Sequence, residues 1–445
     1  MLEVLNTLLW GAGTLALILG TGAWLTLRTG GFPQRNLGRA LTLSLGREAQ
    51  RKGRGGVSPF GSLMTALAST VGTGNIVGVA AALVSGGPGA LVWMELAALL
   101  GLAAKFAECM LAVKYRRVRR DGTRWGGPMA VMETRLGSAG AVLGRFYALF
   151  ALLMAFTMGA LAQSGALADT FAAAFTLPRY KVGLVTAVLA LVILLGGVRR
   201  IADAATVLVP VMALLYIGGG LAVILGNLRR LPEAVTLMLR CAVAPEAALG
   251  GALGIVTRRE ALRWGVARSV FSNEAGLGSA AITAACADTE DPVKQGLISM
   301  TGVFFDTMVI CTVTGLAICC SGTLGAADGN GHPLTGAALT LRAFETVLGP
   351  LAPWLIGVAL GLFAFTSVLG CAVQAETTAS YLLGPGAVRP CRVLYGLAVF
   401  AGAVIPMATV LQLADLANAL MAFPNLVCLL LLSGEIAGEC GRKER

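Results

Sequence analysis

Long apolar segments, separated by short polar stretches, make up most of this 445-residue chain. Because about 20 apolar residues in a helix can cross the roughly 30 Å hydrocarbon core of a bilayer, each segment is a candidate membrane-spanning helix. The pattern predicts eleven such helices, at residues 4–27, 59–85, 88–113, 141–173, 182–197, 202–226, 262–287, 293–321, 351–382, 391–408 and 411–433.

The composition supports a membrane protein. Hydrophobic residues make up 56% of the chain, charged residues only 13%, and the mean hydropathy is +0.79. Soluble domains carry about a quarter charged residues, so a soluble enzyme, a disordered chain and a secreted disulfide scaffold are disfavoured. The first apolar run lacks a basic start and is long enough to span, so we expect it to remain in the mature protein. The sequence therefore predicts a multi-pass protein of the cell membrane, in contact with the lipid bilayer.

The net charge of +11 does not indicate nucleic acid as a partner. The 34 Lys and Arg lie mostly in short blocks between apolar runs, as in cytoplasmic loops of membrane proteins. Residues 28–57 and 114–135 are such blocks, and with eleven helices they place the N-terminus outside and the C-terminus in the cytoplasm. Residues 227–260 are then external, with a short surface helix expected around Pro232–Cys241.

Sites for enzyme chemistry or a metal cofactor are poorly supported. The ten Cys contain no CxxC pair, and the chain has one His, His332. An enzyme working within the membrane would need clustered catalytic or metal-binding residues, and a channel would more naturally show a short repeated pore motif. We expect no enzyme activity and no cofactor, and no obligate protein partner is evident.

Two apolar segments are interrupted by glycine-rich polar stretches, STVGTGN at Ser69–Asn75 and SNEAGLGS at Ser272–Ser279. Each begins a run of five predicted helices, and matching interruptions in two similar halves indicate a secondary transporter built from inverted repeats. The predicted organisation is an extra first helix and basic loop at 1–57, a first five-helix repeat at 58–226, an external connection at 227–261, a second repeat at 262–434 and a cytoplasmic tail at 435–445.

The interruptions are the predicted binding site. Unpaired backbone groups in lipid cost several kcal/mol, so an unwound stretch persists only where protein or a water-filled cavity surrounds it. Unwinding at Gly72–Gly74 frees carbonyls for a small cation and offers amide groups to a carboxylate, and Gly276–Gly278 supplies the opposite wall. The alternative is close helix packing, because Gly74 and Gly78 have GxxxG spacing. The interleaved polar residues favour the site, for an anionic or zwitterionic solute with a co-transported cation.

The chain also resembles the alanine or glycine:cation symporter family over about residues 58–434. The resemblance rests on ALASTVGTGNIVGVA at 66–80, GGPGALVWM at 86–94, DG followed by GGPM at 121–129, VFSNEAGLGSA at 270–280, GVFFDT at 302–307, FAFTSVLG at 363–370 and FPNL at 423–426. It implies sodium-coupled import of a small neutral amino acid. The implied fold is all-α, with ten core helices in two inverted repeats as in neurotransmitter-type sodium symporters, and the first helix lies outside that core.

Specific residues follow from the resemblance alone. It assigns sodium to the carbonyls of Ala68 and Val71 and to the hydroxyls of Thr366 and Ser367, and hard oxygen ligands of this kind suit sodium. The alternative for the hydroxyls is a bond to their own helix. The substrate-binding residues that it implies are Gly72, Thr73, Gly74, Asn75, Gln163, Phe271, Ser272, Asn273, Gly276 and, at a position where the family has Trp, Cys371.

Departures from the family pattern bear on the substrate. The family's usual GWSYYGER is GCAVQAET here, so Cys371 replaces a Trp and Gln374 a Tyr. Loss of a large ring predicts a pocket for a side chain bulkier than that of alanine, or for a polar one that reaches Gln374. Coupling to protons and channel-like permeation remain alternatives, with Glu95 as the candidate proton carrier.

Intramembrane charges are costly and usually face the protein interior. Among them, Lys105 and Glu108 are one helical turn apart and are expected to form a structural pair. Glu274 lies within the second interruption, where we expect it to brace the unwound backbone.

Overall fold

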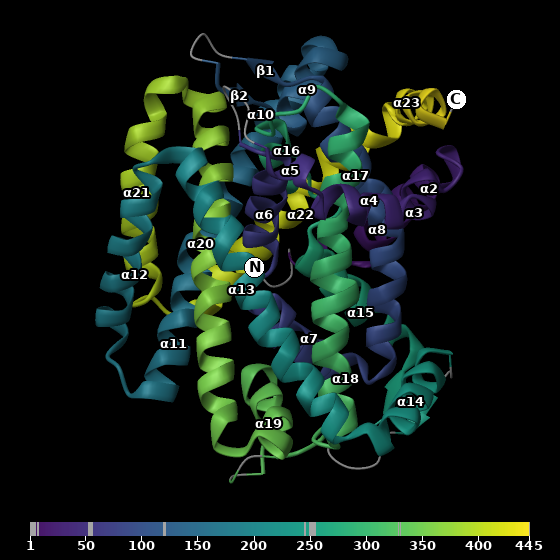
Figure 1. Cartoon of the computed structure of the whole chain (residues 1–445), viewed down its shortest axis with the longest axis vertical. Coiled ribbons are helices and arrows are strands. Elements are labelled where there is room, and N and C mark those ends of the chain that lie inside the picture. Colours follow the sequence, from purple (N-terminus) through teal and green to yellow (C-terminus); the bar gives the residue numbers. More distant parts are fainter. Residues whose placement is uncertain are drawn as a thin grey trace.

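The computed structural model describes residues 6, 9–51, 57–118, 122–243, 246–248, 255–327, 329 and 331–444, and this part of the chain is almost entirely helical (Figure 1). The first α-helices are α2 (Ala12–Arg28), α3 (Phe32–Arg35), α4 (Leu37–Leu45), α5 (Arg47–Gln50), α6 (Pro59–Thr70), α7 (Val77–Gly86), α8 (Gly89–Lys114), α9 (Pro128–Arg135), α10 (Gly137–Met154), α11 (Gln163–Phe175), α12 (Arg179–Leu194) and α13 (Gly197–Gly226). The later ones are α14 (Leu231–Val243), α15 (Arg258–Asn273), α16 (Ser279–Ala285), α17 (Pro292–Val303), α18 (Thr312–Ser321), α19 (Gly336–Leu348), α20 (Ala352–Leu383), α21 (Val388–Gly402), α22 (Met407–Leu431) and α23 (Ser433–Glu444).

Short irregular helices and two small hairpins complete the described chain. The 3₁₀-helices are η1 (Thr73–Asn75), η3 (Leu228–Arg230), η5 (Gly349–Leu351) and η6 (Pro385–Ala387), and the π-helices are η2 (Ala155–Ala162) and η4 (Phe304–Cys311). The antiparallel hairpins pair β1 (Arg117–Val118) with β2 (Arg124–Trp125), and β3 (Glu246–Ala248) with β4 (Ile255–Thr257).

Many of these helices suit a bilayer. Within the described residues, six are long and apolar enough to cross it: Gly89–Lys114, Gly137–Ala172, Gly197–Gly226, Pro292–Ser321, Gly336–Leu383 and Thr409–Leu431. Pro59–Thr70 and Thr73–Gly86 form a seventh when this bent pair is counted as one span. The eleven predicted segments fall largely on helices, but the number that cross the bilayer, the domain boundaries and the inverted repeats stay predictions.

The connections differ from expectation in one place and agree in another. Residues 28–57 were expected to form a loop, yet they contain α3, α4 and α5. These short helices bury Phe32 and Ala40, and the buried hydroxyl of Ser44 lies 3.1 Å from that of Thr301 on α17, so the segment packs on the bundle. The helix expected around Pro232–Cys241 is present as α14.

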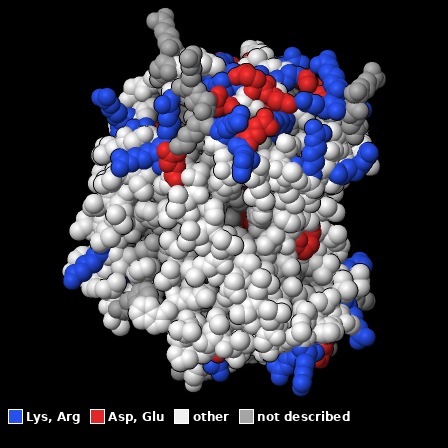
Figure 2. Space-filling view, in the orientation of Figure 1, with Lys and Arg blue, Asp and Glu red and all other residues white. Residues whose placement is uncertain are grey.

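Charge is distributed as in a protein with two aqueous ends. Figure 2 shows charged side chains gathered at both ends of the molecule and a wide, mostly uncharged belt between them. The hairpin β1–β2, α9 and α23 lie at one end, and α14 and α19 at the other (Figure 1). The segments predicted to be cytoplasmic thus share one end, and the orientation of that end stays a prediction.

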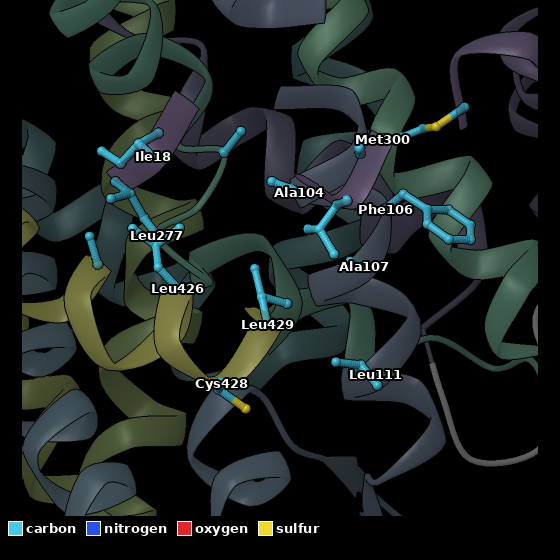
Figure 3. Packing of buried hydrophobic residues seen from close by; sticks show 14 of the residues in the cluster. Ile18, Ala104, Phe106, Ala107, Leu111, Leu277, Met300, Leu426, Cys428 and Leu429 are labelled. Atoms are coloured by element: carbon cyan, nitrogen blue, oxygen red, sulfur yellow. The ribbon is translucent and has the colours of Figure 1, made fainter. Parts of the chain in front are cut away.

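The interior packs the N-terminal helix onto one of the two interrupted segments. Leu277, between α15 and α16, belongs to the same buried cluster as Ile18 of α2 and Leu426 of α22 (Figure 3). A Cβ at Gly276 would lie 3.1 Å from Leu426 and 3.7 Å from Ile18. The interrupted chain is therefore enclosed by apolar side chains on this side, as an unwound stretch at membrane depth requires.

Candidate functional site

The first predicted break is confirmed. α6 ends at Thr70, the backbone at Val71 and Gly72 is extended, and η1 then leads into α7. The two helical arms are bent by 63° relative to each other.

This break releases backbone carbonyls from their helical hydrogen bonds, among them those of Ala68 and Val71. In an uninterrupted helix, the N–H of Gly72 would donate to Ala68 and the N–H of Asn75 to Val71. Instead, Gly72 N–H donates to Asn75 Oδ1 (3.0 Å) and Asn75 N–H donates to the carbonyl of Gly72 (3.3 Å). The carbonyls of Ala68 and Val71, which are among those released, are the two that the family resemblance assigns to sodium.

Helix α20 lies directly against these carbonyls. Ser367 Oγ is 3.4 Å from the carbonyl oxygen of Val71. The helix comes this close because residue 370 is glycine: a Cβ on Gly370 would lie 2.4 Å from the backbone nitrogen of Ser69. Two of the predicted sodium ligands, one on each element, are therefore in contact.

The hydroxyl of Thr366 is bonded to its own helix, which was the alternative to a role as a sodium ligand. It donates to the carbonyl of Phe363 in its own helix (3.0 Å) and lies 3.2 Å from Met212 Sδ. Thr366 is completely buried beside Ser367. A role in binding a cation would require rotation of this hydroxyl, which costs one intrahelical bond.

The second predicted break is also confirmed. α15 ends at Asn273 and α16 begins at Ser279. Between them, Glu274, Gly276 and Gly278 have positive φ angles of 53°, 92° and 77°. Glycine adopts this conformation readily but glutamate does not. The carboxylate of Glu274 accepts a hydrogen bond from the Ser279 hydroxyl, so it joins the two ends of the break through a side chain, whereas the sequence predicted a contact with the unwound backbone.

Side chains from other helices hold the second break open. Lys105 Nζ donates to the carbonyl of Glu274 (3.1 Å), and Asn425 Nδ2 donates to the carbonyl of Gly276 (2.9 Å). Glu108 Oε1 accepts from the N–H of Gly278 (3.1 Å) and from Asn425 Nδ2 (2.7 Å). These groups replace the helical partners that the unwound backbone lacks.

The expected pair of Lys105 with Glu108 is therefore wrong in its contacts. Neither forms an ion pair within the described residues, and each bonds a different backbone group of the second break. Their spacing in the sequence places them one helical turn apart. The unwound chain between α15 and α16, however, has a carbonyl that needs a donor and an N–H that needs an acceptor, and these groups bind the two side chains instead.

A buried hydrogen-bond cluster connects the two breaks. Asn75 Nδ2 lies 3.0 Å from Ser272 Oγ and 2.8 Å from Asp306 Oδ1, and Ser272 Oγ donates to Asp306 Oδ2 (2.7 Å). Thr307 Oγ1 donates to the same carboxylate (3.0 Å). Asn75 lies on the first break, Ser272 at the end of α15 just before the second break, and Asp306 on η4, so one carboxylate connects three elements.

Two more predicted residues adjoin the first break. Gln163, at the start of α11, lies so close that a Cβ on Gly72 would be 3.4 Å from its Nε2, and Thr73 Oγ1 is 3.5 Å from its Oε1. The ring of Phe271 covers the other glycine, since a Cβ on Gly74 would lie 3.6 Å from Phe271 Cδ1.

Three predicted substrate residues face elsewhere. Asn273 is occupied by Ser269 and Thr307, to which its amide donates. Gly276 faces α2 and α22. Cys371 lies in a separate apolar cluster, where a Cβ added to Gly159 would be 2.2 Å from the Cβ of Cys371.

Both π-helices lie next to the breaks, and nothing in the sequence signalled them. η2 ends where Gln163 begins, and η4 contains Asp306. Single π-helical turns occur frequently at functional sites because they re-aim the residues beside them. Asp306 itself was recognisable as an acid within an apolar segment, but its position against Asn75 was not.

We expect Asp306→Asn to destabilise the protein. The carboxylate accepts from Asn75, Ser272 and Thr307, and an amide would leave one acceptor oxygen for three donors. An unsatisfied buried donor costs about 1–3 kcal/mol, which should lower the apparent melting temperature in detergent by roughly 2–6 °C. Glu233→Gln, on the exposed face of α14, is the control. Equal melting temperatures for both variants and wild type would contradict the cluster's structural role.

This fold and this sequence are similar to those of known transporters. A crystal structure of MhsT in complex with L-phenylalanine has the same fold, with a TM-score of 0.61 over 85% of this chain and 90% of that chain at 14% identity. Sodium/alanine symporter AgcS from Methanococcus maripaludis is 41% identical over 441 residues, which cover 99% of this chain and 96% of AgcS. The probable sodium/glutamine symporter GlnT from Bacillus subtilis is 36% identical over 438 residues, covering 97% and 87% of the two chains.

The architecture is thus that of an integral membrane transporter with two broken helices. The profile of the sodium:alanine symporter family matches residues 1–441, and the chain belongs to this family. It is a cation-coupled amino-acid transporter and not an enzyme.

Proposed function

We propose that the chain imports a small neutral amino acid together with sodium by alternating access. The observation that carries this proposal is the release of the Ala68 and Val71 carbonyls beside the Ser367 hydroxyl. A cluster of uncharged oxygens suits sodium, because sodium prefers hard oxygen ligands and carbonyl and hydroxyl oxygens can bind it without a negatively charged side chain.

The substrate carboxylate would bind the amide groups that follow the break. The N–H of Gly72 is already taken by Asn75, so the N–H groups of Thr73 and Gly74 are the ones that remain for an anion. Their position at the beginning of a helical arm adds a favourable dipole. Gln163 would contribute its amide beside them, and Phe271 would close the pocket above Gly74.

The size of the substrate side chain follows from α20. Gln374 is completely buried, and neither of its amide atoms has a hydrogen-bond partner within the described residues. A buried amide of this kind costs free energy unless something binds it. This supports a polar side chain longer than that of alanine, while Cys371, in its apolar cluster, would act as a wall only after a rearrangement.

The mechanism requires the broken helices to move against the remaining bundle. Eleven spans with an external N-terminus and two inverted repeats at 58–226 and 262–434 are part of this proposal. Cation and amino acid would each satisfy backbone of the same unwound strand, so their binding should be coupled. By linkage, sodium should tighten amino-acid binding by the same factor as the amino acid tightens sodium binding.

Uptake into proteoliposomes tests the proposal. An inward sodium gradient should drive accumulation of glycine, L-alanine or L-glutamine against a gradient, with L-glutamine favoured if Gln374 binds the side chain. Strict preference for glycine or alanine would reject the larger pocket. Accumulation driven by a proton gradient without sodium would support the alternative of proton coupling, and passive conductance would support a channel.

The residue on which proton coupling would depend has a polar partner. Glu95 Oε1 accepts a hydrogen bond from Thr312 Oγ1 at 2.8 Å, and Glu95 is partly exposed. This carboxylate is therefore hydrogen-bonded to the residue that directly follows η4.

A further inference from the structure

A hollow lies beside α15, and Phe271 is one of the residues that line it. Its volume is about 200 Å³. This is below the roughly 300–1,000 Å³ of sites for drug-sized ligands and therefore suits a small solute. The residues that line it are Asn6, Trp10, Arg263, Trp264, Ala267, Arg268, Phe271 and Asp415.

The hollow contains opposite charges that are not paired with each other. Arg268 on α15 and Asp415 on α22 are near enough to interact electrostatically. Among the described residues, however, neither forms an ion pair, for which the N–O distance would be at most 4.0 Å. Both are only partly exposed, so their charges are incompletely solvated.

Aromatic rings hold the guanidinium in position. Arg268 Cζ lies 5.5 Å from the ring centroid of Trp264 and 5.5 Å from that of Phe271. Its stem lies along α7, since a Cβ on Gly78 would be 3.9 Å from Arg268 Cδ. Such cation–π contacts orient a guanidinium without neutralising it. The charge therefore remains available to a ligand.

The N-terminal segment, which is outside the predicted ten-helix core, covers the acidic side of the hollow. Trp10 Nε1 donates to the carbonyl of Asp415 (2.9 Å), and Asn6 Nδ2 donates to the carbonyl of Gln412 (2.9 Å). These bonds attach the segment to the beginning of α22. Both bonds use backbone oxygens, and within the described residues the carboxylate of Asp415 forms no ion pair.

We propose that this hollow is an outer binding site for a zwitterionic amino acid, with the substrate carboxylate at Arg268 and its ammonium group at Asp415. The inference rests on the proposed transport function. A zwitterion carries one negative and one positive group. Its carboxylate could pair with Arg268 and its ammonium group with Asp415, which do not form an ion pair with each other. Phe271 lies between the outer site and Gly74, so an amino acid bound in the outer site would be separated from the first break by this ring.

Equilibrium binding of radiolabelled L-alanine and L-glutamine to the purified full chain in saturating sodium tests the site. Wild type should bind two molecules of one of these probes per chain. Arg268→Gln and Asp415→Asn should each bind one, and should raise the KM of uptake roughly 10-fold while changing the maximal rate less. Arg268 packs on the ring of Phe271, whereas Asp415 lies on a different helix, α22, so agreement between the two variants argues against an indirect effect through that ring. Arg259→Gln, exposed on the same helix, is the matched control.

The outcomes separate this inference from the transport function. One bound molecule in wild type, with unchanged binding and KM in both variants, overturns the outer site while uptake still supports transport. Absence of sodium-driven uptake and of binding by wild type overturns both. L-Alaninamide, which lacks the carboxylate, should fail to displace the second molecule, and displacement by it would contradict recognition by Arg268.

Discussion

Gly72→Ala is expected to lower uptake at subsaturating sodium and amino acid roughly 10- to 100-fold in a protein that still folds. The backbone at Gly72 is extended, with φ −136° and ψ −156°, so other residues can adopt it. The obstacle is space: the new Cβ would lie 2.8 Å from Ser367 Oγ and 3.4 Å from Gln163 Nε2. Overpacking of this kind costs about 1–3 kcal/mol, or roughly 10- to 100-fold in affinity. Loss falls on cation and substrate together because the methyl group lies between their proposed ligands.

The measurement is initial uptake at several sodium and amino-acid concentrations. Gly218→Ala on α13 is the matched control, because its Cβ would have no atom within 4 Å. It should transport like wild type. Wild-type kinetics for Gly72→Ala would show that Ser367 and Gln163 do not enclose the site.

Removal of either hydroxyl on α20 should weaken sodium binding. Ser367→Ala and Thr366→Val each delete one proposed ligand, and a bond to a charged group is worth about 1.5–3 kcal/mol. The sodium concentration for half-maximal uptake should therefore rise roughly 10- to 100-fold. The maximal rate at saturating sodium should change much less.

Thr378→Val supplies the matched control for Thr366. Thr378 is also buried on α20, and its hydroxyl donates to the carbonyl of Gln374 (2.7 Å) in its own helix. If Thr366 only bonds its helix, as its present geometry shows, the two valine variants will have the same sodium dependence. A difference between them is what a cation site requires.

Sequence reasoning located the breaks well because an interruption is a local property. Glycines and polar side chains within an apolar segment indicate that the helix is interrupted there and that some of its backbone groups lack helical partners. The stretches STVGTGN and SNEAGLGS show this without any other part of the chain. The position of Glu274 within the second break was visible for the same reason, although its bond to the Ser279 hydroxyl was not predicted. Residue assignments such as Gln163 came from the family resemblance, and the structure brings Gln163 to Gly72.

Contacts between distant segments were not predictable in this way. Lys105 was expected to bond Glu108, but the carbonyl of Glu274 needed a donor and lay within reach. Asp306 was recognisable as a buried acid, yet only packing could show that it joins Asn75 to Ser272. The two π-helices carry no sequence signal because they arise where packing forces an extra residue into a helical turn.

By itself, the sequence determined that this is a helical membrane protein and where two of its helices are interrupted, so that backbone carbonyls are released there. These depend on hydropathy and on bonds between residues a few positions apart. Tertiary structure alone decided which helix each break faces, why Gly276 turns to α22, and how Trp10 reaches Asp415. Those contacts join residues far apart in the chain, and close packing, not local preference, selects them.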